Sequence, residues 1–444
     1  MRSSIRYESQ KGKKMQEKTE NLKGKKLLIL GGAHLHCGLV KTAKDLGIET
    51  FVTDNLPIGI SPARQLADHA WELNVTDVDT IVERCRQEHI DGVINIYFNF
   101  CQIPYQQICE RLGLPCFGTR EQYRIFTDKK RFLNTCVEHG LDIIPAYREE
   151  DFAFDNSSIE YPVYVKPSDS RGSRGQHICR SYTEVGPAIE QARRESTNGG
   201  VIIEKFMENA KDVHISLLMI DGEPWLEGAF DMYSGFDENM QILPYAFAIK
   251  SHESGAYVNE QLRGRLGDML RALKLQNSPV SLQGFLSGGR LYLHDCALSF
   301  AGDLYEEDLK NKLGLDIYSP LIAFSLSGRF PSRLKNILRL ANLNKIVMTS
   351  MRVYVRPGRI HTIRGIEEAV KRKGVFNFVS AYKEGDVIED WHDIRQNFSL
   401  FAIVVESKAE AHEVIKYIYE TLQVLDENGE DMKLPLPDMP WLRD

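Results

Sequence analysis

Residues 161–176 read Tyr-Pro-Val-Tyr-Val-Lys-Pro-Ser-Asp-Ser-Arg-Gly-Ser-Arg-Gly-Gln, and this stretch decides how the rest of the chain is interpreted. The valines and tyrosine before Lys166 are typical of a buried strand. Pro167 ends that strand, because proline has no backbone N–H to donate. The loop that follows contains two glycines, which let successive N–H groups approach a bulky anion. The stretch predicts either a phosphate-binding loop beside Lys166 or a β-hairpin with a flexible basic tip.

Length and composition indicate an ordinary globular protein. The 444 residues predict roughly two to four domains. A net charge of −7 argues against a protein that coats nucleic acid. The longest apolar runs, 27–30 and 400–405, are strand-sized, so we expect no membrane span. The eight cysteines show neither CxxC pairs nor a framework spacing, which indicates reduced thiols in a cytoplasmic protein.

The N-terminal third alternates between strands and helices. Residues 1–23 are rich in lysine and poor in apolar positions, so we expect a disordered arm, and the sequence leaves open whether Met1 or Met15 is the start. Strands are expected at 26–30, 48–53, 92–96 and 114–117, with helices near 39–46, 78–88 and 103–112. This order predicts a parallel sheet with helices on both faces. The glycines at 31 and 32 lack the G-x-G-x-x-G spacing of a dinucleotide site, although residues 31–36 can still line a cleft beyond the strand ends.

Two further segments contain candidate ligand contacts. Asp128 begins a predicted helix that runs to about residue 139, and Lys129 in its first turn opposes the helix dipole unless an anion lies nearby. The alternative for Lys129 is a solvated charged turn. The strand from residue 201 ends in Glu204-Lys205-Phe206, which offers an aromatic wall and backbone groups to a purine. Asp212, shortly after, is a carboxylate for two ribose hydroxyls. Each of these residues also has an ordinary explanation as a charge on an edge strand.

The order of these motifs resembles the ATP-grasp superfamily, and within it the biotin-carboxylase-like and carboxylate–amine ligase branches. The resemblance extends from about residue 24 to the C-terminus and includes Gly314-Leu-Asp316, which is similar to a Gly-x-Asp segment of the family. It implies a mixed α/β and α+β chain with the ATP-grasp fold. The implied domains are an N-terminal Rossmann-like parallel-sheet domain at 24–122, a nucleotide-binding and catalytic region at 123–330, and a C-terminal β-rich domain at 331–444 that completes the cleft.

The resemblance also implies roles for individual residues. Lys129 and Lys166 would hold the phosphates of ATP, and Ser173 and Gly175 would lie in the loop that closes over them. Lys166, Ser173 and Gly175 are therefore the implied catalytic set. The adenine would meet Glu204, Lys205 and Phe206, and the ribose would meet Asp212.

The metal site departs from the family pattern. Gln283 and Asp295 can each offer an oxygen to Mg²⁺ or Mn²⁺. The family places an asparagine and an arginine shortly after the second ligand, where this chain has Ala297 and Ser299. Losing one ligand and one cation weakens stabilisation of the transferred phosphoryl group. The acidic run at 303–308 could supply a ligand, but a solvated helix start is the more ordinary interpretation.

The C-terminal region concentrates positive charge. Arg356 and Arg364 are candidate contacts for a carboxylate substrate, because a guanidinium binds a carboxylate in a two-pronged manner. About half of such arginines on a two-faced strand simply face solvent.

These observations predict an ATP-dependent ligase that joins a carboxylate, such as an amino acid, to an amine through an acyl phosphate and releases ADP and phosphate. The alternatives are a nucleotide-binding pseudoenzyme with a regulatory or scaffold role and a carboxylase that uses bicarbonate. The expected partners are small-molecule carboxylate and amine substrates, without nucleic acid or membrane. The sequence leaves the substrates and the oligomeric state open, a homodimer being the most frequent state.

Overall fold

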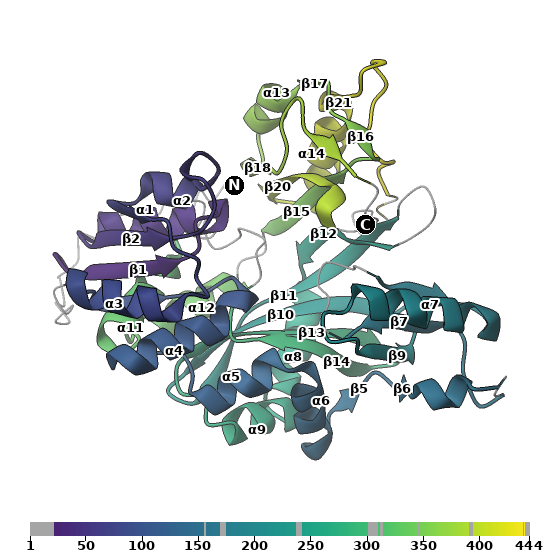
Figure 1. The fold of residues 1–444 in the computed structure, drawn as a ribbon, viewed down its shortest axis with the longest axis horizontal. Coiled ribbons are helices and arrows are strands. Elements are labelled where there is room, and N and C mark those ends of the chain that lie inside the picture. Colours follow the sequence, from purple (N-terminus) through teal and green to yellow (C-terminus); the bar gives the residue numbers. More distant parts are fainter. Residues whose placement is uncertain are drawn as a thin grey trace, which may run out of the picture.

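The computed structural model describes residues 22–154, 157–168, 175–236, 242–300, 310, 314–343, 346–389, 394–437 and 439, and every structural statement below concerns these residues. Figure 1 shows a purple N-terminal domain, a long central sheet, a small sheet under one helix, and a yellow-green C-terminal region. Among the described residues, no helix combines the length and apolar character needed to cross a membrane.

The N-terminal domain is built on a parallel sheet in the order β3-β2-β1-β4. Residues Leu27 to Leu30 of β1 are fully buried, which is what helices on both faces of a parallel sheet require. Helix α11 comes from much later in the chain and packs against β4 and α1. The elements are β1 (Lys26–Leu30), α1 (Cys37–Asp45), β2 (Glu49–Thr53), α2 (Pro62–Leu66), β3 (His69–Trp71), α3 (Val78–Glu88), β4 (Gly92–Ile94), α4 (Gln102–Leu112) and α11 (Tyr318–Ser327).

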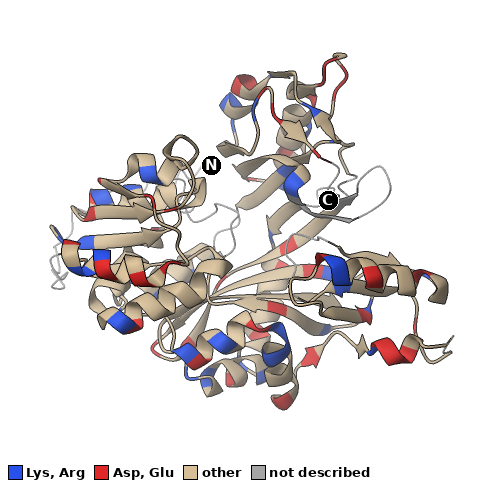
Figure 2. Ribbon diagram, in the orientation of Figure 1, with Lys and Arg blue, Asp and Glu red and all other residues tan. Residues whose placement is uncertain are grey.

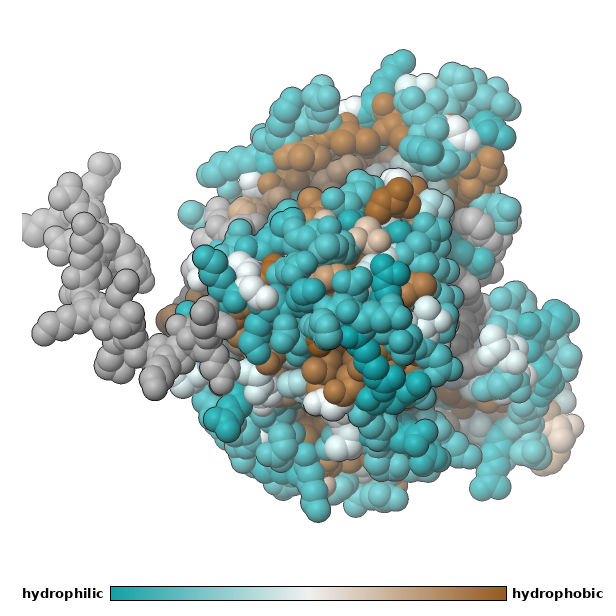
Figure 3. Space-filling view, turned by 60° about the vertical axis from the view of Figure 1, so that its left-hand side comes forward, coloured by the Kyte–Doolittle hydropathy of each residue, from teal (hydrophilic) through white to brown (hydrophobic). Residues whose placement is uncertain are grey.

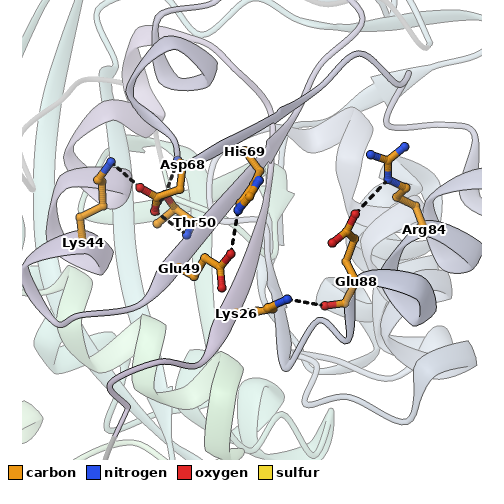
Figure 4. Close-up of polar contacts among 8 residues, drawn as sticks. All are labelled: Lys26, Lys44, Glu49, Thr50, Asp68, His69, Arg84 and Glu88. Atoms are coloured by element: carbon orange, nitrogen blue, oxygen red, sulfur yellow. Dashed lines mark hydrogen bonds and ion pairs between the residues drawn. The ribbon is translucent and has the colours of Figure 1, made fainter.

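Polar contacts attach the edge strand β3 to this sheet (Figure 4). Asp68, just before β3, accepts hydrogen bonds from the backbone N–H and hydroxyl of Thr50 at 2.9 and 2.8 Å and pairs with Lys44 at 2.8 Å. Burial opposes ionisation of Asp68, but the Lys44 and Thr50 contacts outweigh it and lower its pKa to about 2. His69 contacts Glu49 across the two strands at 2.7 Å. The edge is therefore held by side chains as well as by its backbone ladder.

Two sheets follow the N-terminal domain. The small sheet has the order β6-β9-β7-β8 and packs against α7, while the central sheet has nine strands in the order β18-β20-β15-β12-β11-β10-β13-β14-β5. The small sheet and its helix are β6 (Ala146–Tyr147), β7 (Val163–Pro167), β8 (His177–Cys179), α7 (Tyr182–Glu195) and β9 (Val201–Lys205). The central strands from residues 142–297 are β5 (Asp142–Ile143), β10 (Lys211–Ile220), β11 (Glu223–Phe236), β12 (Ile242–Lys250), β13 (Ser278–Ser287) and β14 (Arg290–Ala297).

Helices flank the central sheet, and the C-terminal strands extend it. The helices before β15 are α5 (Arg120–Thr127), α6 (Lys129–Glu138), α8 (His252–Gln261), α9 (Arg265–Ala272) and α12 (Leu334–Leu343). The later elements are β15 (Val347–Tyr354), β16 (Gly358–Arg359), β17 (Thr362–Arg364), α13 (Ile366–Lys371), β18 (Val375–Ser380), β19 (Val387–Ile388), β20 (Asn397–Val405), α14 (Lys408–Thr421) and β21 (Gln423–Leu425). Strands β15, β18 and β20 of the C-terminal region extend the central sheet, and β16-β19 and β17-β21 form two separate two-stranded sheets.

One predicted strand is absent. Residues 114–117 form an irregular segment, in which the Phe117 N–H donates to the hydroxyl of Tyr105 at 3.3 Å and the Phe117 ring stacks on Phe324. Side-chain packing against two helices takes the place of a strand partner. In Figure 2 the charged residues of both signs are interspersed over the helices, while the strands are mostly tan.

Candidate functional site

Strand β7 presents Lys166 to the central sheet. Val163 and Val165 are fully buried in the small cluster that packs against α7, so the alternating positions Tyr164 and Lys166 point to the opposite face. The Lys166 Nζ atom lies 5.7 Å from the centroid of the Tyr164 ring. Lys166 itself is buried.

Lys166 forms a buried ion pair with Glu204 of the neighbouring strand β9. Burial and the positive charge of Lys129 lower the pKa of Lys166 to about 8, against the opposing influence of Glu204 and Asp295. A buried ion pair contributes to stability only while both partners are present, because removing one leaves an uncompensated buried charge. The charges of Lys129, Glu204 and Asp295 therefore all act on the Lys166 ammonium group.

Lys129 begins helix α6, as the sequence predicts. Asp128 is the residue before the helix, and its carboxylate accepts a hydrogen bond from the Arg131 N–H at 3.1 Å. Lys129 is half-buried and contributes positive charge at both Lys166 and His294. The first turn of α6 is therefore directed at the site.

The segment after Glu204 is already committed to backbone hydrogen bonds. The N–H groups of Lys205 and Phe206 donate to the carbonyls of Pro145 and Pro162 at 2.8 and 2.9 Å. The Lys205 side chain pairs with Glu160. Phe206 is half-buried, with its ring centroid 6.0 Å from that of Tyr164. Because the N–H groups of Lys205 and Phe206 are already paired, this segment offers a nucleotide base the aromatic surface of Phe206 instead.

The central sheet contributes a row of polar side chains across three strands. His214, Gln283 and Asp295 are direct cross-strand neighbours on β10, β13 and β14. The Gln283 amide contacts His214 Nδ1 at 3.4 Å. Asp212 is two residues before His214 and therefore shares its face. Burial raises the pKa of Asp212 to about 7, and its Oδ1 atom has no hydrogen-bond partner among the described residues.

His294 connects this row with the lysines. Its ring stacks on Phe285 with centroids 4.9 Å apart. Burial, together with the positive charges of Lys129 and Lys166, holds its pKa well below the usual histidine range. His294 is therefore neutral at physiological pH. Sequence reasoning did not identify His214 or His294 as site residues, although both lie within two residues of a predicted ligand.

Gln283 and Asp295 fit a magnesium ion that keeps most of its other ligands as water and phosphate oxygens. Both supply oxygen donors, and their pairing across β13 and β14 places them side by side. The described residues contain no cluster of three or more His, Cys, Asp or Glu side chains arranged for a metal. The predicted pair is thus brought together, but it supplies only one carboxylate.

Ala297 and Ser299 lie where the family pattern has an asparagine and an arginine. Ala297 is buried, and the Ser299 hydroxyl donates to Asn99 Oδ1 at 3.0 Å. Ser299 therefore connects the end of β14 to the N-terminal domain. The acidic run at 303–308 lies outside the described residues.

The remaining predicted residues have separate locations. Gly175 has a φ of +65°, and a Cβ there would lie 2.8 Å from the Cβ of Glu195, so this position requires glycine. Ser173 lies outside the described residues. Arg356 pairs with Asp426 at 2.7 Å and Glu430 at 3.4 Å, which balances its charge within the C-terminal region, and Arg364 is an exposed residue of β17. The structure does not bring these two arginines to the lysine cluster.

Comparison with known proteins gives a family match over the nucleotide-binding segment. Residues 126–223, which include Lys129, Lys166, Glu204 and Asp212, match the family model described as the carbamoyl-phosphate synthase L chain, ATP binding domain. The chain is 25% identical over 211 residues to the 2-oxoglutarate carboxylase small subunit of Hydrogenobacter thermophilus, an alignment that covers 44% of this chain and 45% of that subunit. The chain thus spans less than half the length of this relative.

Two solved structures share the fold over most of the chain. An L-amino acid ligase from Bacillus licheniformis superposes with a TM-score of 0.73 and 15% identity, covering 91% of this chain and all of that chain. The biotin carboxylase domain of the Hydrogenobacter thermophilus 2-oxoglutarate carboxylase, a dimer in complex with MgADP, ADP and bicarbonate, gives a TM-score of 0.69 and 18% identity over 90% of both chains. The predicted ATP-grasp superfamily and fold class are confirmed.

Proposed function

We propose that this ATP-grasp protein is an ATP-dependent ligase that joins a carboxylate to an amine through an acyl phosphate. The observation that supports it best is the convergence of Lys129, Lys166 and the buried Glu204 on one side with Asp212, Gln283 and Asp295 on the other. Two cations beside a face with oxygen donors suit a polyphosphate.

In the proposed reaction, a carboxylate oxygen of the substrate attacks the γ-phosphorus of ATP and the bond to the β-phosphate oxygen breaks, which leaves ADP and an acyl phosphate. The amine nitrogen then attacks the acyl carbon, inorganic phosphate departs, and the amine proton passes to solvent. Lys129 and Lys166 hold the phosphates in line and offset the charge that develops on their oxygens. The Asp212 carboxylate accepts hydrogen bonds from the ribose hydroxyls.

A bound Mg²⁺ would neutralise phosphate charge between Gln283 and Asp295. The protein's own residues set the positions of the reactants. Because Glu204 holds Lys166 by a buried ion pair, the ammonium is fixed before ATP arrives. Fixed charges need no reorganisation during the reaction, which is the basis of electrostatic catalysis.

The test is ADP release from MgATP in the presence of pooled amino acids, pooled small carboxylic acids, or bicarbonate, each beside a Lys166→Ala control. We expect release that depends on one organic pool and disappears in the control. Dependence on bicarbonate alone would identify a carboxylase instead.

A second candidate is a nucleotide-binding protein without turnover. It is favoured by one observation, the neutral Ala297 and Ser299 at the end of β14. ATP binding without ADP release from any pool would support it over the ligase. The proposed oligomeric state is a homodimer, in line with the dimeric structural neighbour.

A further inference from the structure

The segment that follows helix α4 folds back along the last turns of that helix. The Leu114 N–H donates to the Cys109 carbonyl at 3.0 Å, and the Phe117 N–H donates to the hydroxyl of Tyr105 at 3.3 Å. Tyr105 and Cys109 are one helical turn apart and share one face of α4. The chain reversal therefore brings Cys116, next to Phe117, alongside Cys109.

The thiols of Cys109 and Cys116 contact each other. Cys109 is fully buried, whereas Cys116 is partly exposed. The Cys109 thiol donates a hydrogen bond to the Cys116 sulfur, and this contact, with the Gly118 N–H, lowers the pKa of Cys116 against the opposing influence of burial. Burial raises the pKa of Cys109 itself. Cys116 is therefore the thiol that ionises more readily, and it has a protonated thiol beside it.

Two properties of Cys116 favour oxidation. The thiolate, and not the thiol, attacks an oxidant, so a lowered pKa and access to solvent both increase reactivity. A protonated thiol beside the oxidised sulfur can then displace its oxygen and complete a disulfide. Cys136 and Cys179 lack both properties, because they are buried and burial raises their pKa values to about 12 and about 11.

The backbone around Cys116 allows the two sulfurs to approach further. A disulfide bond brings them from hydrogen-bond contact to about 2.0 Å. Residues 114–117 form an irregular segment with no strand partner among the described residues. A small shift of this segment toward α4 therefore breaks no backbone ladder.

The segment also packs against the end of β14. A Cβ on Gly118 would lie 3.0 Å from the Cδ1 atom of Leu298, the residue before Ser299. The Phe117 ring stacks on Phe324 of α11. A disulfide at this position therefore changes packing beside the transfer end of the candidate site.

We propose that Cys116 and Cys109 are a redox-sensitive dithiol, which a small hydroperoxide converts into a reversible disulfide. The Cys116 thiolate attacks one oxygen of the hydroperoxide, the O–O bond breaks, and the other oxygen leaves and takes up a proton. The Cys109 sulfur then attacks the sulfur of the resulting sulfenic acid, and its oxygen departs as water with the Cys109 proton. The two thiols are oxidised to one disulfide, and the hydroperoxide is reduced to water and an alcohol or a second water.

The test maps disulfides in the full chain after treatment with hydrogen peroxide. This water-soluble oxidant suits the face of the N-terminal domain that comes forward in Figure 3, which is mainly hydrophilic. Remaining thiols are blocked with N-ethylmaleimide, and the protein is digested with trypsin without reduction. Cleavage after Arg111 separates the two cysteines. We expect peptide 112–120 to be linked through Cys116 to Cys109 of peptide 87–111, and dithiothreitol to remove the link.

Alkylation measures the reactivity of Cys116 without an oxidant. With limiting iodoacetamide near neutral pH, we expect Cys116 to react about tenfold faster or more than Cys136 and Cys179, because each unit of difference in pKa changes the thiolate fraction about tenfold. Mass spectrometry of the tryptic peptides gives the rate at each cysteine.

Two variants separate the roles of the thiols. Cys109→Ser retains a hydroxyl donor but forms no disulfide, so the sulfenic acid at Cys116 persists and is captured by dimedone. Cys116→Ser abolishes the linked peptide and leaves Cys109 reduced. Cys179→Ser is the matched control, and it leaves the linked peptide unchanged.

Three results would overturn the proposal. Cys116 could react no faster than Cys136 and Cys179, it could be oxidised in the wild type without a link to Cys109, or Cys109 could pair instead with Cys85 of α3, whose thiol also lies near it. Cross-links spread equally over other cysteines would show unselective oxidation and would reject the dithiol too. These readouts do not involve ADP release, so the dithiol and the ligase function succeed or fail separately.

Discussion

The two sides of the candidate site differ in how much charge they hold. On the small sheet, Lys166 and Glu204 form a buried ion pair, with Lys129 close by. At the transfer end of the central sheet, Gln283, Ala297 and Ser299 are neutral, and Asp295 is the charged member of the predicted metal pair. In the proposed ligase, the first side would bind the polyphosphate of ATP, and the second offers fewer groups than the family pattern for transferring the terminal phosphate.

Under the proposed function, nucleotide binding and phosphoryl transfer therefore depend on separate residues of one cleft. A substitution at Ala297 or Ser299 should leave Lys129 and Lys166 in place. The reason is that the Ser299 hydroxyl donates its hydrogen bond to Asn99 of the N-terminal domain and not to the small sheet.

The largest effect is expected at Lys166. Lys166→Ala leaves Glu204 buried without its partner, so we expect a loss of about 3–5 kcal/mol of stability together with loss of ATP binding. Urea unfolding and calorimetry measure the two effects. The double variant Lys166→Met with Glu204→Gln is the control. It recovers most of the stability but not ATP affinity, and recovery of both would show that the pair is purely structural.

Asp212, on strand β10 of the central sheet, is tested through pH. Its pKa, about 7 in the folded protein, lies above the unfolded value near 4, so the folded protein binds the proton more tightly. The carboxylate therefore destabilises the fold increasingly as pH rises from about 4 to about 7. Asp212→Asn should be neutral near pH 4 and stabilising above pH 7, by up to roughly 3–4 kcal/mol in urea unfolding. Asp45→Asn on the exposed face of α1 is the matched control, and an equal effect at both pH values would contradict the burial of Asp212.

Restoring the transfer end should raise turnover. Ala297→Asn with Ser299→Arg supplies an oxygen donor and a cation, and we expect ADP release to increase by about 100-fold with little change in ATP affinity. Ser299→Ala, which only removes the hydrogen bond to Asn99, is the control. An unchanged rate in the double variant would indicate that this chain obtains its transfer groups elsewhere.

The smallest effect is expected at the metal pair. Gln283→Glu adds a second carboxylate beside Asp295 and should lower the Mg²⁺ concentration for half-maximal ATP binding by about tenfold. Gln283→Met, which removes the oxygen at similar size, should raise it. Identical Mg²⁺ dependence in both variants would place the metal away from β13.

Local elements were predictable from the sequence, and long-range partners were not. The helix predicted at 78–88 is observed with the same bounds, because its periodicity and its cap at Asp77 are local signals. The pairing of β15 with β12, which joins the C-terminal region to the central sheet, connects residues about 100 positions apart, and no local pattern encodes it. The segment at 114–117 has strand-like composition, but the Tyr105 hydroxyl and the Phe324 ring provide its contacts.

The same difference between local and long-range signals applies to the candidate site. Lys166 and Glu204 were identifiable because each ends a recognisable strand, whereas His214 and His294 depend on register across β10, β13 and β14. The assignments of individual site residues and the domain boundaries stay predictions.

The measurement that tests the ligase most directly follows oxygen from the substrate to the phosphate. Once a pool supports ADP release, its carboxylate is labelled with ¹⁸O and the released phosphate is examined by mass spectrometry. An acyl phosphate requires that one labelled oxygen appears in each phosphate. Phosphate that carries no label, released at the same rate, would contradict the proposed reaction.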